Sequence, residues 1–152
     1  MKKSLKVLSL VLVLVMAVLT LASCSQYNAL KSAFEKNGYE ENTKLEDTAE
    51  KIKTELEKDN LTVTLHLMTK KEGLTAGLTS ALIIEFKSTE DMKKAYEDSE
   101  TIKGFVKDVS SNEDVKEFQK VLENAGYAKG NCLVVPLSIM YINEITNIVK
   151  EA

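Results

Sequence analysis

The alternation of hydrophobic and polar residues is clearest in the middle of the chain, where it predicts a β-hairpin. In residues 61–68 every odd position is aliphatic, and in residues 74–86 the even positions are mostly hydrophobic. A period of two is typical of a strand with one buried face, and residues 69–73 are suited to the connecting loop. The compact apolar run 131–136 is typical of a strand covered on both faces, and it ends at Pro136.

Helical spacing of hydrophobic residues predicts most of the remaining chain to be α-helical. The expected helices cover about 25–37, about 44–58, a segment capped by Ser88, residues 102–109, a segment from Ser111 or Asn112 to Gly126, and a last segment capped by Ser138. The helical crossover between the second and third strands is long enough to place them parallel. We therefore predict an α+β fold, with a small three-stranded mixed sheet (the long hairpin plus one strand) and helices packed mainly on one face.

The N-terminal segment has the pattern of an export signal. Lysines at positions 2, 3 and 6 precede an apolar run over residues 7–21, which is shorter than the roughly 20 residues needed to span a bilayer. The run ends in Leu21-Ala22-Ser23-Cys24: an aliphatic residue, two small ones and a cysteine. This segment resembles the lipobox of bacterial lipoproteins.

The resemblance implies a lipid anchor. Cys24 would carry a diacylglyceryl group and become the first residue of the mature chain, and Leu21, Ala22 and Ser23 would be read by the signal peptidase. Residues 1–23 would then be removed, leaving 24–152 as a single mature α+β domain outside the cytoplasm, held at the cell membrane by its N-terminal lipid. The alternative is an ordinary secretory signal whose cleavage site contains a cysteine.

Charge and composition restrict the partners of the mature domain. The chain has 20 lysines and no arginine, and removal of three lysines with the leader leaves 17 against 23 acidic residues, a net charge of −6. The charges are interspersed, which indicates a solvated surface and argues against a nucleic-acid partner. Without arginine, the chain also lacks the residue best suited to bidentate phosphate or carboxylate binding.

The cysteines and acidic clusters indicate no disulfide, metal or cofactor. With Cys24 lipidated, Cys132 has no partner, and its aliphatic neighbours predict a buried thiol with a raised pKa. Oxygen donors gather at Glu40-Glu41 and at residues 111–114, but neither cluster has the spacing of a calcium loop. We expect helix-cap and surface roles for both.

Three residues are weak candidates for contact with a ligand or partner. His66 is the single histidine; a catalytic triad or zinc site needs further partners, so we expect a solvent-facing histidine on its strand. Thr75 and Thr79 share a small, polar strand face, which can accept a partner strand or a ligand but can equally be covered by the chain's own helices.

One internal similarity is visible. Residues 30–39 align without gaps on residues 118–127, and both segments end in Gly-Tyr. The two segments can be a duplicated unit, or two helices that share a favourable ending.

No catalytic motif is present, so we expect a non-enzymatic lipoprotein that binds a protein or envelope partner through its sheet or a helical face. The first alternative is a carrier of a small ligand near the membrane, which needs a large apolar pocket. The second is a hydrolase or redox enzyme, which needs His66 or Cys132 in a concave cluster with acids.

Overall fold

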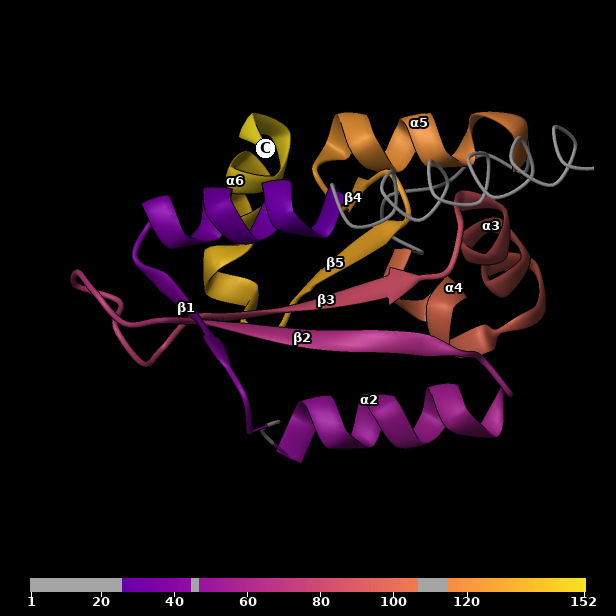
Figure 1. The fold of residues 1–152 in the computed structure, drawn as a ribbon, viewed down its shortest axis with the longest axis horizontal. Helices are drawn as coiled ribbons and strands as arrows, with labels where there is room; N and C mark the ends of the chain where they lie inside the picture. The colour runs from indigo at the N-terminus through magenta and orange to yellow at the C-terminus, as the bar shows by residue number, and fades with distance from the viewer. Residues whose placement is uncertain (1–25, 45–46, 107–114) are drawn as a thin grey trace, which may run out of the picture.

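The structure, a computed structural model, describes residues 26–44, 47–106 and 115–152. Within them a five-stranded antiparallel sheet has the strand order β1-β2-β3-β5-β4 (Figure 1). A helix over residues 26–36 comes first. The other elements are β1 (Tyr39–Asn42), α2 (Asp47–Lys58), β2 (Val63–Lys70), β3 (Ser80–Phe86), α3 (Thr89–Asp98), α4 (Glu100–Val106), α5 (Val115–Ala125), β4 (Ala128–Lys129), β5 (Cys132–Pro136), the 3₁₀ turn η1 (Ile139–Tyr141) and α6 (Ile142–Glu151).

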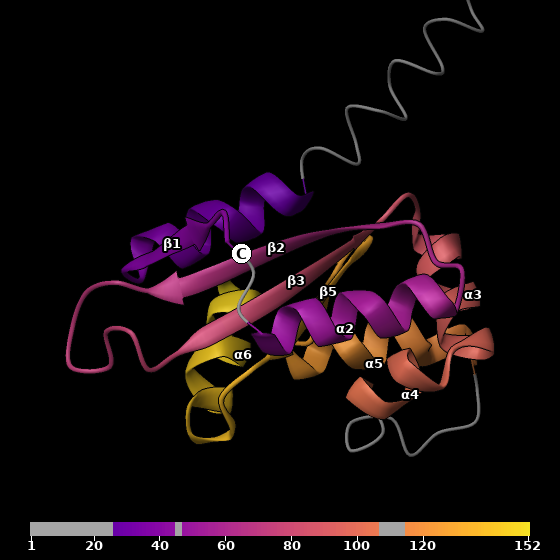
Figure 2. The same ribbon diagram turned by 90° about the horizontal axis from the view of Figure 1, so that it is seen from below.

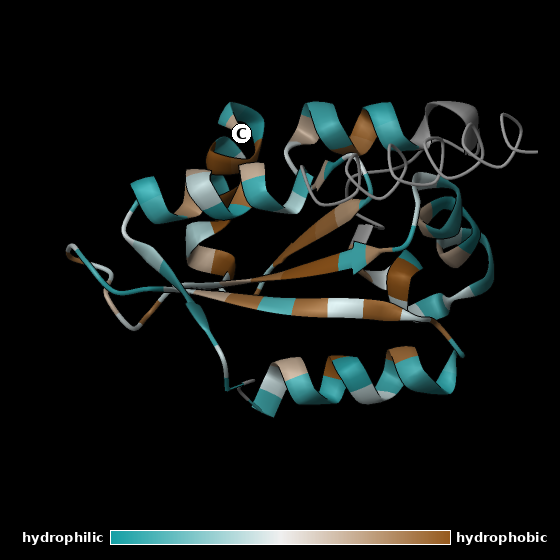
Figure 3. Ribbon diagram, viewed as in Figure 1, coloured by the Kyte–Doolittle hydropathy of each residue, from teal (hydrophilic) through white to brown (hydrophobic). Residues whose placement is uncertain are grey.

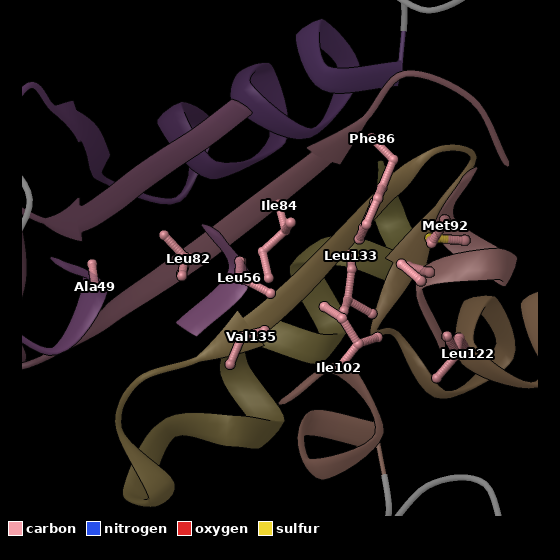
Figure 4. Packing of buried hydrophobic residues seen from close by; sticks show 12 residues of the cluster. Ala49, Leu56, Leu82, Ile84, Phe86, Met92, Ile102, Leu122, Leu133 and Val135 are labelled. Atoms are coloured by element: carbon pink, nitrogen blue, oxygen red, sulfur yellow. The ribbon is translucent and has the colours of Figure 1, made fainter. Parts of the chain in front are cut away.

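Helices cover both faces of the sheet, so the domain has three layers. We call the side lined by Leu82, Ile84 and Phe86 of β3 the α2 face, and the side lined by Ala81 and Ile83 the α6 face. The α2 face packs against α2, α3, α4 and α5 (Figure 4), and the α6 face packs against helix 26–36 and α6. Figure 1 shows helix 26–36 and α2 on opposite sides of β2 and β3. Because alternate residues of β3 enter different cores, the strand is hydrophobic on both faces (Figure 3).

The α+β class is confirmed, but three details of the predicted sheet are wrong. The sheet has five strands rather than three, it is wholly antiparallel rather than mixed, and its helices lie on both faces. The helical crossover begins and ends at the same end of the sheet: Glu85 pairs with Cys132, and the Phe86 N–H donates to the Asn131 carbonyl at 3.0 Å. A return to the same end makes β5 antiparallel to β3.

The predicted hairpin is real, but its loop is longer than expected. β2 continues to Lys70 and β3 starts only at Ser80, so residues 71–79 form the loop. The Lys70 N–H donates to the Thr79 carbonyl at 2.9 Å, and the Gly77 N–H donates to the Lys70 carbonyl at 2.7 Å. The alternation of residues 74–78 therefore continues the pattern of a strand without being part of one.

The two Gly-Tyr segments have equivalent places in the fold. Gly38 and Gly126 both have positive φ, +80° and +82°, and each reverses the chain between a helix and an edge strand. Tyr39 opens β1, and Tyr127 directly precedes β4. This is the left-handed helix ending for which glycine is suited.

Two capping predictions have different outcomes. The Ser88 hydroxyl accepts a hydrogen bond from the Asp91 N–H at 3.0 Å, which confirms it as the cap of α3. Ser138 precedes η1 instead of α6, and its side chain makes no capping hydrogen bond. The caps predicted at Ser111 or Asn112 lie outside the described residues. In the part of the chain that is described, no helix is both long enough and apolar enough to cross a bilayer.

Candidate functional site

His66 lies under helix 26–36 on the α6 face of the sheet. Its ring stacks on that of Tyr27, with ring centroids 3.6 Å apart and an interplanar angle of 17°. Only 13% of the His66 side chain is exposed, so the prediction of a solvent-facing histidine is wrong. His66 lies on the side of β2 opposite the aliphatic odd positions, and the start of helix 26–36 covers its ring there.

Both ring nitrogens of His66 face a carboxylate. Nδ1 lies 2.9 Å from an oxygen of Glu41 on β1, and Nε2 lies 3.0 Å from an oxygen of Glu85 on β3. A doubly protonated ring donates a hydrogen bond to both carboxylates, whereas a neutral ring has one N–H and donates to only one of them. The histidine thus joins three adjacent strands through side chains, in addition to their backbone ladder.

Lys31 and Tyr27 extend this cluster into helix 26–36. The Lys31 ammonium lies 2.8 Å from Glu41, and this hydrogen bond, together with that from His66, lowers the pKa of the Glu41 carboxyl from 4.5 to about 2. Burial, with the neighbouring Glu41, raises the pKa of the Tyr27 hydroxyl well above its ordinary value of 10.0. We call Tyr27, Lys31, Glu41, His66 and Glu85 the histidine cluster.

The lowered pKa of Glu41 predicts a specific acid sensitivity. Because the folded-state pKa lies below that of the unfolded chain, this carboxylate stabilises the fold fully above pH 4.5, and its contribution is lost as the pH falls towards 2. Lys31→Met should raise the folded-state pKa, so unfolding free energies from urea titrations between pH 2 and 5 should fall less steeply with acid than in the wild type. Lys36→Met, on the same helix, is the matched control. Equal slopes in both variants would contradict the assigned role of Lys31.

The geometry of the histidine cluster suits attachment better than chemistry. Each ring nitrogen is already occupied by a carboxylate, which leaves no free nitrogen to activate a nucleophile or bind a metal ion. Among the described residues, no group of three or more His, Cys, Asp and Glu side chains is arranged to hold a metal. Glu41 was expected at the surface or at a helix cap; it instead ties β1 to β2 and to helix 26–36.

A second ionic contact attaches α6 to the other part of the same face. Glu144 accepts hydrogen bonds from the Lys70 ammonium at 2.7 Å and from the Tyr39 hydroxyl at 2.9 Å. The Lys70 nitrogen also lies 4.8 Å from the centroid of the Tyr39 ring. Both helices of the α6 face are therefore tied to β1 or β2 by charged groups.

The remaining candidates do not form a site with His66. Cys132 is a free, buried thiol, and burial, with the nearby Glu85 carboxylate, raises its pKa to about 12, as its aliphatic neighbours predicted. Thr79 is fully buried, and its hydroxyl has no hydrogen-bond partner. Thr75 is half-buried in the hairpin loop, so the prediction that it shares a strand face with Thr79 is wrong. Cys24 and the residues before it lie outside the described residues.

Large hydrophobic side chains are exposed at one end of the sheet. Leu74 and Leu78 in the β2–β3 loop are 103% and 65% exposed, and Ile139 and Met140 in η1 are 87% and 85% exposed. Both segments adjoin the end of the sheet where β3 starts and β5 ends, and there the Leu137 N–H donates to the Ser80 carbonyl at 2.9 Å. The loop forms the left end of the domain in Figure 1 and carries apolar segments in Figure 3. We call Leu74, Leu78, Ile139 and Met140 the apolar end.

The sequence does not predict this surface, because the hydrophobic pattern places Leu74 and Leu78 in a strand and residues 139–140 at the start of the last helix. Since residues 74–78 form a loop and residues 139–140 a 3₁₀ turn, these four side chains are left exposed by the part of the chain that the structure describes. Exposed hydrophobic residues far apart are ordinary, but a group of them at one end is a mark of an interaction surface.

The surface depressions of the described part are open and bordered by charged residues. One of about 420 Å³ lies beside α3, and its lining includes Asp59, Asp91 and Lys94. Another of about 400 Å³ lies between α5 and α6, with Glu123 and Lys150 on its walls. Neither has the enclosed apolar character of a typical small-molecule site.

Comparison of the chain with models of protein families, with curated proteins and with solved structures gives no match.

Proposed function

We propose that the chain is an extracytoplasmic lipoprotein, held at the cell membrane by a lipid on Cys24, whose mature domain binds a protein partner of the envelope without catalysing a reaction. The anchor is inferred from the motif Leu21-Ala22-Ser23-Cys24. The binding role is carried by the apolar end, which exposes four large hydrophobic side chains from two separate loops.

Two observations favour a protein over a lipid surface as the occupant of the apolar end. The mature chain has a net charge of −6, which is repelled by anionic lipid headgroups. The side chains also come from two separate segments, the β2–β3 loop and η1, and not from the single amphipathic helix that is typical of a membrane-surface contact. Burying a leucine or isoleucine of this kind is worth about 1.5–3 kcal/mol.

The alternatives receive less support. A carrier of a small apolar ligand needs an enclosed pocket, and the depressions beside α3 and between α5 and α6 are open and partly charged. A hydrolase needs an available base, and both nitrogens of His66 are engaged by Glu41 and Glu85. We therefore propose that the histidine cluster serves to hold helix 26–36 on the sheet. This helix directly follows the proposed anchor in the sequence.

The test is recovery of the partner from detergent-solubilised membranes with the tagged, full-length protein. We expect the double variant Leu74→Ser/Leu78→Ser to recover at least tenfold less partner than the wild type, because two apolar contacts are lost. Lys71→Ser/Glu72→Ser, two exposed polar positions in the same loop, is the matched control and should bind normally.

Three outcomes would contradict the proposal. The first is equal recovery with the double variant and the control. The second is the recovery of no partner while a small apolar ligand raises the melting temperature by several degrees, which would favour the carrier. The third is a double variant that loses binding only to lipid vesicles, which would make the apolar end a membrane contact.

A further inference from the structure

Half of strand β2 has an open edge. β1 pairs only with the second half of β2, from Leu67 to Lys70. Among the described residues, no strand pairs with the outer side of 63–66, which forms the upper rim of the sheet in Figure 2. An unpaired edge of this kind is a template for another strand.

The register identifies which backbone groups face outwards. Lys70 exchanges backbone hydrogen bonds with the β3 side, so even-numbered residues of β2 point their N–H and C=O groups at β3. Odd-numbered residues point the other way, and Leu67 and Thr69 are paired there with β1. Val63 and Leu65 continue the odd set beyond the end of β1, and their backbone groups are directed to the open side.

The two edges of the sheet differ in how well they are protected against pairing with another strand. On the far edge, β4 covers the start of β5, the Val134 N–H donates to the Tyr127 carbonyl at 2.8 Å, and Pro136 has no N–H to offer. Beside the open half of β2, residues 61–65 contain no charge, proline or glycine, so their own sequence does not protect this edge. Thr64 in β2 and Thr62 just before it are both exposed beside this edge.

We propose that a second copy of this chain occupies the open edge, and that β2 of each copy pairs antiparallel across a two-fold axis at Thr64. Val63 then pairs with Leu65 of the second copy, and Leu65 with Val63, each pair exchanging both backbone hydrogen bonds. Thr64 faces Thr64 of the second copy in a non-hydrogen-bonded pair, where two threonines are favourable. The two sheets become one continuous antiparallel sheet.

The side chains around this axis are self-complementary. On the α2 face, a depression of about 430 Å³ runs between α2 and the open edge, lined by Lys53, Glu57 and residues 61–65. The two-fold axis sets the α2 helices antiparallel, so Lys53 of one copy approaches Glu57 of the other. Leu61, Val63 and Leu65 are half-buried on the same side and gain apolar cover.

The axis is also compatible with anchoring of both copies in one membrane. Tyr27 stacks on His66, so helix 26–36 begins close to the axis on the α6 face. A two-fold axis perpendicular to the sheet keeps both helix starts on that same face. The dimer surface does not include the apolar end, so the dimer can form whether or not the proposed partner exists.

Disulfide trapping tests this geometry in membranes that contain the full-length protein. Residues in a non-hydrogen-bonded antiparallel pair have Cα atoms about 4.5 Å apart, which a disulfide can bridge. Thr64→Cys should therefore give a covalent dimer on mild oxidation at least tenfold faster than Thr62→Cys, whose two copies would lie about 13 Å apart. Both positions are exposed threonines beside the open edge, and Cys132 is buried, so the background is the same.

A proline substitution separates this pairing from chance collision. Val63→Pro, added to Thr64→Cys, removes an N–H that points outwards, and should abolish trapping with little change in melting temperature. Equal trapping rates for Thr64→Cys and Thr62→Cys would overturn the proposal. So would trapping that survives the proline substitution.

Discussion

Gly126→Ala is expected to destabilise the domain more than any other single-methyl addition to its glycines. A Cβ atom at position 126 would lie 2.3 Å from the Thr146 carbonyl oxygen and 2.9 Å from the Thr146 carbonyl carbon, both in the backbone of α6. The residue also has a φ of +82°, which costs an alanine about 1–2 kcal/mol. Together these effects should lower the free energy of unfolding by more than about 3 kcal/mol.

Two other glycines separate the two causes. Gly77 has a φ of +74° but open space around it, so Gly77→Ala should cost only the conformational part, about 1 kcal/mol. Gly104 lies inside α4 with no atom near its Cβ position, so Gly104→Ala should raise stability by about 0.5–1 kcal/mol. Urea unfolding of the wild type and the three variants measures these changes in the free energy of unfolding. If Gly126→Ala cost no more than Gly77→Ala, the close approach of the α5 exit to α6 would be wrong.

Cys24→Ser is expected to abolish maturation. The proposed lipid is attached to the thiol, which serine lacks, and the proposed peptidase cleaves directly before this cysteine. The variant should accumulate as a precursor that retains residues 1–23, with no mature lipidated form. Gel mobility after fractionation of cells into membrane and soluble material measures this.

Cys132→Ser is the matched control for Cys24→Ser. It removes the other thiol of the chain. This thiol is buried in the core that the sheet forms with helix 26–36 and α6. It should be somewhat less stable but processed and anchored normally. A Cys24→Ser protein that is still cleaved and still held at the membrane would contradict the anchor.

Strands with their own pattern could be predicted from the sequence, and strands held by their neighbours could not. β2, β3 and β5 have regular hydrophobic positions; β2 and β5 lie within two residues of their predicted bounds, whereas β3 has its predicted end but starts six residues later than predicted. β1 and β4 are edge strands of four and two residues, and nothing in Tyr39–Asn42 alternates between hydrophobic and polar. They form strands because β1 pairs with β2 and β4 pairs with β5 through backbone hydrogen bonds.

The direction of β5 and the partners of His66 depend on long-range packing. A crossover of three helices can return a chain to either end of a sheet, so length alone did not determine that β5 is antiparallel. Glu41 and Glu85 lie 25 and 19 residues from His66, and they meet it because adjacent strands place their even or odd positions on one face. Neither carboxylate has a local signal that marks it as a partner of the ring.

The proposed anchor, unlike these contacts, is inferred from local sequence alone. It depends on four consecutive residues and on the apolar run before them, and no tertiary contact is needed to recognise it. The apolar end, in contrast, depends on the fold, because the antiparallel pairing of β3 and β5 brings the hairpin loop and η1 to the same end of the sheet. The location is thus proposed from the sequence, and the binding surface from the fold.

The lipid on Cys24 is tested most directly by mass spectrometry of the intact mature protein purified from membranes. We predict a chain that begins at Cys24 and carries the added mass of a diacylglyceryl group on its N-terminal cysteine. A mature chain that begins at another residue, or one that begins at Cys24 with a free thiol, would contradict the proposed anchor.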